Sequence, residues 1–172
     1  DPAARTRRAR VACAPVTAAL TDPLELPCGL VLPNRLGRAA MTEGIATSRN
    51  DPTAGHAALY AANAAGGAGL VLTGNVMVDR RHLERARNVV LDAATDEAAL
   101  RRWAAACQGA PTLMQISHPG RQVNRYVQSH PVAPSDGPAV KLAGAFARPR
   151  ALTVAEIGEV RERFLDTAAR AV

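Results

Sequence analysis

The chain has 172 residues, 48% of them hydrophobic, which is enough for one globular domain with a core of its own. Its net charge of +6 comes almost entirely from arginine, with Lys141 the single lysine, and this bias is typical of codon usage in a GC-rich genome. No run approaches the roughly 18 uninterrupted apolar residues of a membrane span, and with aromatic residues at 3% and no recognition motif we expect neither a membrane nor a nucleic-acid partner.

The first residues differ in composition from the rest of the chain. Four arginines fall within the first ten residues, which contain a single acidic residue. We expect residues 1–20 to be a basic, disordered leader and residues 21–172 to be the folded part; a transit peptide and a nucleic-acid-binding arm are the alternatives for the leader. The cysteines, Cys13, Cys28 and Cys107, are too few and too scattered for a disulfide framework or a zinc site, so a reducing cytoplasm is the expected location.

The first predicted elements are a hairpin, a strand and a helix. Residues 24–32 have short apolar runs around Pro27 and Gly29, which indicate a small β-hairpin. Residues 36–41 form a short segment typical of a buried strand. The alanine-rich residues 54–65 favour a helix, and the glycines that follow them end it.

Strands and helices then alternate. Residues 69–73 are apolar on both faces, as in a parallel strand that is covered on both sides, and a polar loop follows them. Thr95 or Asp96 caps a second helix with a regular apolar face. Residues 111–116 form the next strand.

The last part of the chain contains a long loop and a final helix. Residues 117–150 are rich in proline and glycine, and Thr153 and Glu156 then form a capping box before apolar residues at helical spacing. Strands that alternate with helices indicate a parallel α/β fold. A complete (β/α)8 TIM barrel takes roughly 250 residues, so we expect only its first three βα units here, as a truncated, partial barrel with an N-terminal β-hairpin and an open sheet edge.

Reactive groups of a parallel barrel lie at the carboxyl ends of its strands, where this chain has three polar segments. Thr42 has a hydroxyl that can bind a ligand or cap the next segment, and Gly74 permits either close approach of a flat ligand or a turn at the strand end. Gln115 is an amide within an apolar strand, where an unsatisfied polar group costs about 1–3 kcal/mol. The pyrimidine edge of a flavin would satisfy this amide, and neighbouring backbone groups are the alternative.

Five stretches, in the right order, resemble the old yellow enzyme family of NADH:flavin oxidoreductases, which are FMN-dependent ene-reductases. These are residues 22–42, which end in Ala40-Met41-Thr42; residues 67–71; residues 114–122, with the sequence Met-Gln-Ile-Ser-His-Pro-Gly-Arg-Gln; residues 131–135; and residues 151–164. The resemblance runs from about Thr21 to Val172 and is to the N-terminal portion of the family only.

The resemblance implies an FMN that lies across the mouth of the barrel. NAD(P)H would reduce this FMN, which would then pass hydride to the β-carbon of a small α,β-unsaturated carbonyl compound. Five residues of this chain would bind the cofactor, with Thr42 near the flavin O4 and Gln115 at the pyrimidine edge: Ala40, Met41, Thr42, Gly74 and Gln115. The family usually has proline at the position of Ala40, and this departure loosens the segment.

The family's substrate-binding and phosphate-binding groups follow later strands than those recognised here. We therefore assign no catalytic residue and expect the chain alone to be inactive. His118 and His130 are the nearest substitutes for the family's histidine pair, but they are interpreted as a motif residue and a loop residue. The alternative is a non-catalytic α/β half-barrel that self-associates or binds flavin only. The substrate, the choice between NADH and NADPH, and the oligomeric state are left open.

Overall fold

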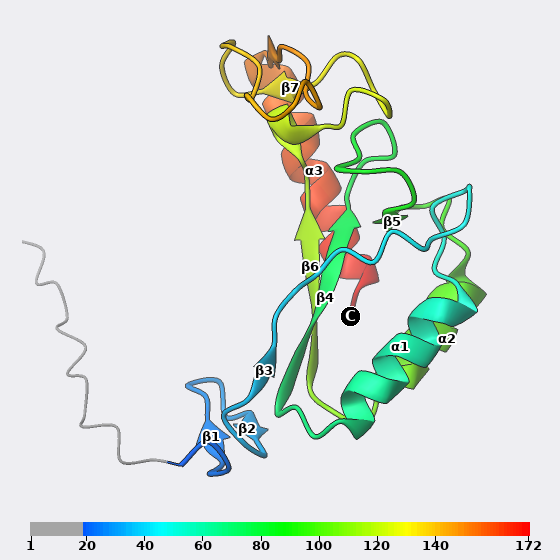
Figure 1. The fold of residues 1–172 in the computed structure, drawn as a ribbon, viewed down its shortest axis with the longest axis vertical. Coiled ribbons are helices and arrows are strands. Elements are labelled where there is room, and N and C mark those ends of the chain that lie inside the picture. The colour runs from blue at the N-terminus through cyan, green and yellow to red at the C-terminus, as the bar shows by residue number, and fades with distance from the viewer. Residues whose placement is uncertain (1–18) are drawn as a thin grey trace, which may run out of the picture.

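The structure is a computed structural model that describes residues 19–172, so the predicted basic leader lies almost wholly outside the described residues. A narrow parallel sheet stands at the centre, helices flank it, and a small hairpin lies at the amino end of the strands (Figure 1). In this part of the chain no helix is long and apolar enough to cross a membrane.

The predicted hairpin is confirmed. β1 (Leu24–Glu25) and β2 (Val31–Leu32) pair antiparallel, with Leu24 opposite Leu32. Gly29 lies in the turn between them with a φ of +84°, a left-handed conformation that glycine adopts without steric cost.

The parallel sheet is built around β4 (Leu70–Met77). β6 (Thr112–Ser117) pairs with β4 along nearly its whole length, with a register shift before Asn75. β3 (Gly37–Arg38) pairs with the start of β4, and β5 (Val89–Val90) pairs with its end. Because β6 occupies one edge of β4, β3 and β5 share the other edge.

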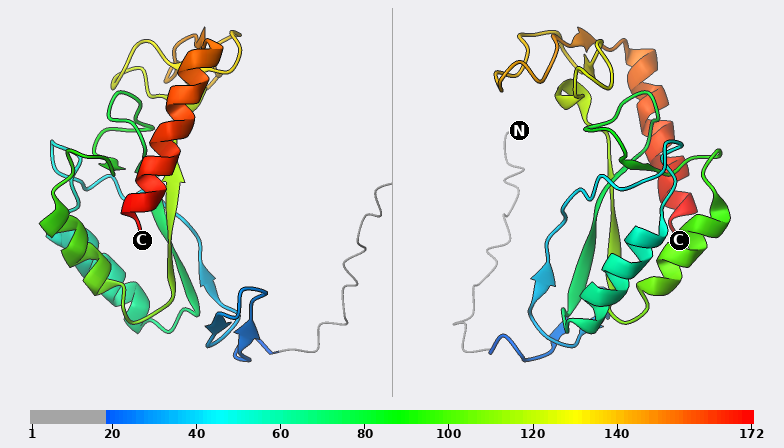
Figure 2. Two further views of the ribbon diagram at one scale, coloured as in Figure 1. Left: turned by 180° about the vertical axis from the view of Figure 1, so that it is seen from behind. Right: turned by 45° about the vertical axis from the view of Figure 1, so that its right-hand side comes forward.

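Two helices cover one face of this sheet. α1 (Ala54–Ala65) has the predicted bounds, and α2 (Glu97–Ala106) begins after Asp96, one of the two predicted caps. The helices pack against each other, and Tyr60 of α1 meets Trp103 of α2 edge-on, with ring centroids 5.3 Å apart. These two side chains belong to the main core cluster. Figure 2 shows α1 and α2 side by side on one flank of the sheet.

The last helix, α3 (Val154–Arg170), begins at the predicted capping box. Thr153 accepts a hydrogen bond from the backbone N–H of Glu156 at 3.2 Å, and the Glu156 carboxylate accepts one from the backbone N–H of Thr153 at 2.8 Å. The predicted apolar face is only partly covered, because Ile157 is 44% exposed and Leu165 is 57% exposed. α3 therefore presents apolar surface that the described residues do not bury.

The loop predicted over residues 117–150 contains short regular elements. These are a 3-10 turn, η1 (Gly120–Gln122), and two short strands, β7 (Val132–Ala133) and β8 (Arg150–Ala151), which pair parallel. Neither this pair nor β5 was predicted, because two residues are too few to show a periodic pattern.

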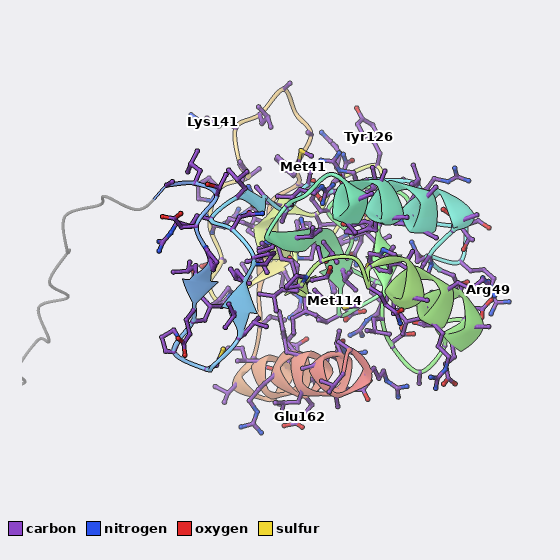
Figure 3. All side chains as sticks on the ribbon, turned by 90° about the horizontal axis from the view of Figure 1, so that it is seen from below. Met41, Arg49, Met114, Tyr126, Lys141 and Glu162 are labelled. Atoms are coloured by element: carbon purple, nitrogen blue, oxygen red, sulfur yellow. The ribbon has the colours of Figure 1, made fainter. Side chains whose placement is uncertain are left out.

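The sheet of the described residues is open, so the predicted parallel α/β fold is confirmed but a closed barrel is not present at this length. Met114 packs against the core cluster and, in Figure 3, points toward α2 and α3. Its neighbours Leu113 and Gln115 point to the opposite face by the alternation of a strand, and both are exposed, Leu113 by 52%. That face corresponds to the interior of the expected partial barrel.

Candidate functional site

The residues predicted to bind a cofactor lie toward the carboxyl ends of neighbouring parallel strands. Ala40, Met41 and Thr42 follow β3 directly, Gly74 lies within β4, and Gln115 lies within β6. Met41 is 62% exposed, Gln115 is also exposed, and Gly74 is buried. The fold therefore brings segments far apart in the sequence to the same end of the sheet, as the sequence predicted.

Thr42 is fixed by a residue that the sequence did not single out. Its hydroxyl donates a hydrogen bond to Glu84 Oε2 at 2.9 Å, and the Asn75 side-chain amide donates to the same oxygen at 3.3 Å. Arg85 holds the other carboxylate oxygen at 2.6 Å. Burial alone would raise the pKa of Glu84, but these donors outweigh it and hold the pKa below its usual value. Glu84 is thus a carboxylate that joins the loop after β3 to the end of β4.

Gly74 is a glycine because the protein itself approaches it closely. A Cβ at this position would collide with the Glu43 carboxylate and with the backbone oxygen of Met41. The Gly74 N–H donates to Tyr60 Oη at 2.9 Å and to Glu43 Oε1 at 3.3 Å. The close approach expected at Gly74 is therefore made by the residues that follow β3.

Gln115 lies beside Asn75, its partner in the register of the sheet. The backbone N–H of Gln115 donates to Thr73 Oγ1 at 2.9 Å, whereas its side-chain amide makes no hydrogen bond within residues 19–172. The amide is thus free on the open face of β6. Neighbouring backbone groups, the alternative partners for this amide, do not bind it in the structure.

A cavity of about 600 Å³ opens beside these residues. It is lined by the end of β4, by the loop that carries Glu84 and by the loop after β6: Asn75, Glu84, Arg85, Gln122, Asn124, Leu142, Ala145 and Phe146. A smaller apolar cavity of about 260 Å³ lies between α2 and β6, on the side of the sheet to which Met114 points. None of the five predicted cofactor-binding residues lines the larger cavity, but two residues of its wall contact them: Glu84 binds the Thr42 hydroxyl, and Asn75 pairs with Gln115.

A second group of titratable side chains also lies past the carboxyl ends of the strands. Ligand atoms of Asp79, His82 and His118 are within 4.8 Å of one another. Arg81 binds Asp79 at 2.7 Å and Arg163 lies 3.3 Å from it; burial alone would raise the pKa of Asp79, but these two cations lower it. The carboxylate therefore already has its counterions.

The histidines of this group are poor metal ligands for a further reason. His118 Nδ1 accepts a hydrogen bond from the Gly120 N–H at 3.1 Å, so in the neutral ring the hydrogen is on Nε2. Metal-binding histidines have the reverse arrangement, in which the second ring nitrogen donates. Burial, followed by the neighbouring His82, lowers the pKa of His118 to about 4. We interpret the group as a pair of neutral histidines, His82 buried and His118 half-buried, beside an ion pair.

The described fold is an open parallel α/β sheet, consistent with part of a barrel, and the candidate residues lie toward the carboxyl ends of its strands. No family model matches the chain. The NADH-dependent flavin oxidoreductase iliE of Hypocrea jecorina is 40% identical over 163 residues, which are 83% of this chain and 40% of that protein. The NADH-dependent flavin oxidoreductase iccE of Talaromyces variabilis is 36% identical, over 84% of this chain and 40% of that protein.

Solved structures agree with these sequence relatives. The old yellow enzyme homologue from Zymomonas mobilis superposes with a TM-score of 0.77 and 26% identity over 90% of this chain and 45% of that chain. Morphinone reductase in complex with tetrahydroNAD also superposes with a TM-score of 0.77 and 26% identity, over 90% of this chain and 46% of that chain. The chain is therefore similar to the N-terminal part of old yellow enzyme homologues and NADH-dependent flavin oxidoreductases. It spans less than half the length of the relatives that it matches.

Proposed function

We propose that the chain contributes the N-terminal half of the cofactor site of an FMN-dependent, NAD(P)H-oxidising ene-reductase, whose substrates are small α,β-unsaturated carbonyl compounds. The observation that carries the proposal is the free amide of Gln115, exposed on the open face of β6 next to Asn75. A primary amide has two donors and an acceptor, which match the alternating C=O and N–H groups of a flavin pyrimidine.

The residues near the cavity fit such a cofactor. Met41 presents a polarisable apolar surface. The Thr42 hydroxyl donates to Glu84 and would turn from it to donate to the flavin O4, a carbonyl oxygen that only accepts. Bound FMN would supply the hydride chemistry, which no protein side chain provides. The role of this chain is then to hold one edge of the cofactor and to exclude water from it.

We expect weak FMN binding and no enone reduction by the 172-residue chain alone. Within residues 19–172 the cavity lining contains no histidine that would polarise a substrate carbonyl, and a flavin held by one edge keeps only part of its affinity. Titration of FMN fluorescence with the chain tests the proposal. Gln115→Ala should weaken binding about tenfold, which corresponds to roughly 1.4 kcal/mol.

The matched control is Gln108→Ala, which removes the same side chain from the exposed end of α2. This variant should bind FMN as the unaltered chain does. Equal affinity of the Gln115→Ala variant and the unaltered chain would remove the basis of the proposal. A cytoplasmic location is expected for such an enzyme and remains a prediction.

The exposed apolar surface favours a second candidate function, a half-barrel module that self-associates. Leu113 on β6 and Ile157 and Leu165 on α3 are all more than 40% exposed. Sedimentation should then show a compact homodimer, and Leu113→Lys should return it to a monomer at little cost in stability because this side chain is not buried. A monomer at all concentrations would exclude the module.

A further inference from the structure

Tyr60 of α1 is the centre of a hydrogen-bond group behind the cofactor segment. Its side chain is only 1% exposed. The Oη atom donates to Glu43 Oε1 at 2.5 Å and accepts from the Gly74 N–H at 2.9 Å. Arg38 lies at 3.4 Å from the same oxygen. The phenol thus contacts both the segment after β3 and the strand β4, and its polar atom is fully satisfied.

Glu43 is the point at which this group holds the segment. Its side chain is 8% exposed, and its nearest cation, Arg38, is 3.9 Å away and bonds the backbone oxygen of Leu72 at 2.9 Å. A buried carboxylate costs several kcal/mol unless its hydrogen bonds are made, as a typical order of magnitude. Glu43 therefore cannot leave Tyr60 without a large penalty, and Thr42, its neighbour in sequence, is held with it.

The segment has no other regular support. Residues 39–47 form neither helix nor strand. Backbone hydrogen bonds hold Ala46 and Thr47 at the end of the segment, and the side chains of Glu43 and Glu84 hold it nearer β3. Gly74 lets the anchor form, because any side chain there would occupy the space of the Glu43 carboxylate and the Met41 carbonyl oxygen. The close contacts with Glu43 and Met41 thus require that residue 74 has no side chain.

We propose that Tyr60, acting through Glu43, is a positioning residue that fixes the segment of Met41 and Thr42, whose hydroxyl binds Glu84 in the wall of the larger cavity. This inference rests on the proposed function. Tyr60 does not line the cavity, and its polar contacts are with Glu43, Arg38 and the backbone N–H of Gly74 rather than with Met41 or Thr42. Its effect on ligand binding comes from restricting the segment that carries Thr42, which reduces the conformational entropy lost when the cofactor is bound.

The test compares Tyr60→Phe with a control in the same core. Tyr60→Phe keeps the ring and its contact with Trp103 but removes the bond to Glu43. FMN binding to the full chain, measured well below the unfolding temperature, should weaken about tenfold. Leu91→Ala, a cavity-forming change in the same core cluster, should lower the unfolding temperature at least as much but leave the FMN dissociation constant unchanged.

A second comparison uses the partner of the phenol. Glu43→Gln keeps an acceptor for Tyr60 Oη and should retain FMN affinity to within about a factor of two or three, as a conservative replacement of one hydrogen-bond acceptor by another. The double variant Tyr60→Phe, Glu43→Gln should bind FMN no more weakly than Tyr60→Phe alone, because both changes act on one contact. Full additivity of the two losses overturns the inference.

A readout without flavin separates this inference from the proposed function. Backbone 15N order parameters of Met41 and Thr42 should fall in Tyr60→Phe and stay unchanged in Leu91→Ala. If they fall but the unaltered chain binds no FMN, the positioning role stands and the proposed function is overturned. Unchanged order parameters, or unchanged FMN affinity in Tyr60→Phe, overturn the positioning role.

Discussion

The hydroxyl of Thr42 donates a hydrogen bond to Glu84 at 2.9 Å, across 42 residues of sequence. A hydroxyl has a single hydrogen, so Thr42 offers only its lone pairs to anything that enters the adjoining cavity while this bond is made. Glu84 therefore decides whether Thr42 acts as a donor or as an acceptor toward a ligand. Because Asn75 binds the same carboxylate oxygen, the loop after β3 and the end of β4 share one anchor.

Removal of the Thr42 hydroxyl should raise the pKa of Glu84. A hydrogen bond to the charged carboxylate favours ionisation, so Thr42→Val takes away one of the donors that lower this pKa, while Arg85 and Asn75 remain. Carboxyl 13C chemical shifts followed against pH measure the change directly. An unchanged Glu84 titration would show that the hydrogen bond is not formed in solution.

Tyr60 should ionise only in strongly alkaline solution. Burial, followed by the hydrogen bond to Glu43, raises the pKa of Tyr60 to about 12 from an ordinary value of 10.0. A raised folded-state pKa gives stability that is present below pH 10 and lost as the pH rises toward 12. The phenolate absorbance of the Tyr126→Phe variant, in which Tyr60 is the remaining tyrosine, should appear only near pH 12. A midpoint near pH 10 would mean that the phenol is accessible to water.

Local patterns in the sequence predicted the regular elements well. An alanine-rich run that ends at glycines predicted α1 with the observed bounds, since helix propensity and termination are local properties. The capping box predicted the start of α3 for the same reason. A two-residue strand such as β5 is too short to show periodicity, and it is recognised as a strand only from its pairing with β4.

The candidate site was predicted less completely. Thr42, Gly74 and Gln115 were singled out because motifs mark them, and the fold brings their segments to one end of the sheet, whereas their binding of a cofactor stays a prediction. Glu43 and Glu84 were not found, because their roles depend on partners in other segments, Tyr60 and Thr42, that no local pattern connects. The sequence alone does not distinguish a buried charged side chain from a solvated one, because burial depends on segments that are distant in sequence.

Stability should fall between pH 6.5 and about 4 because of His118. The pKa of His118 is lowered from 6.5 to about 4 by burial and then by His82, so the unfolded chain takes up a proton in this range before the folded one does. The expected loss is roughly 1–2 kcal/mol after allowance for the water that still reaches the ring. Urea unfolding of the chain at pH 7 and near pH 4.5 measures it.

The informative variant is His118→Asn, whose side-chain oxygen can still accept the Gly120 N–H. It should flatten the pH dependence, while His130→Asn, at an exposed position, should leave the dependence as in the unaltered chain. An equal slope in both variants would show that His118 is not the group responsible.

Two glycines should respond to alanine in opposite directions. Gly158 lies within α3 with open space around its Cα, so Gly158→Ala should raise the free energy of unfolding by about 0.5–1 kcal/mol through helix propensity. Gly69 precedes β4, where a Cβ would strike the backbone and side-chain oxygens of Asn34. Asn34 cannot yield easily, because its side chain bonds Gly67 at 2.8 Å and Leu36 at 2.9 Å. Gly69→Ala should therefore lower the free energy of unfolding by about 1–3 kcal/mol, and a gain in both variants would show that the contact between β3 and β4 is looser than described.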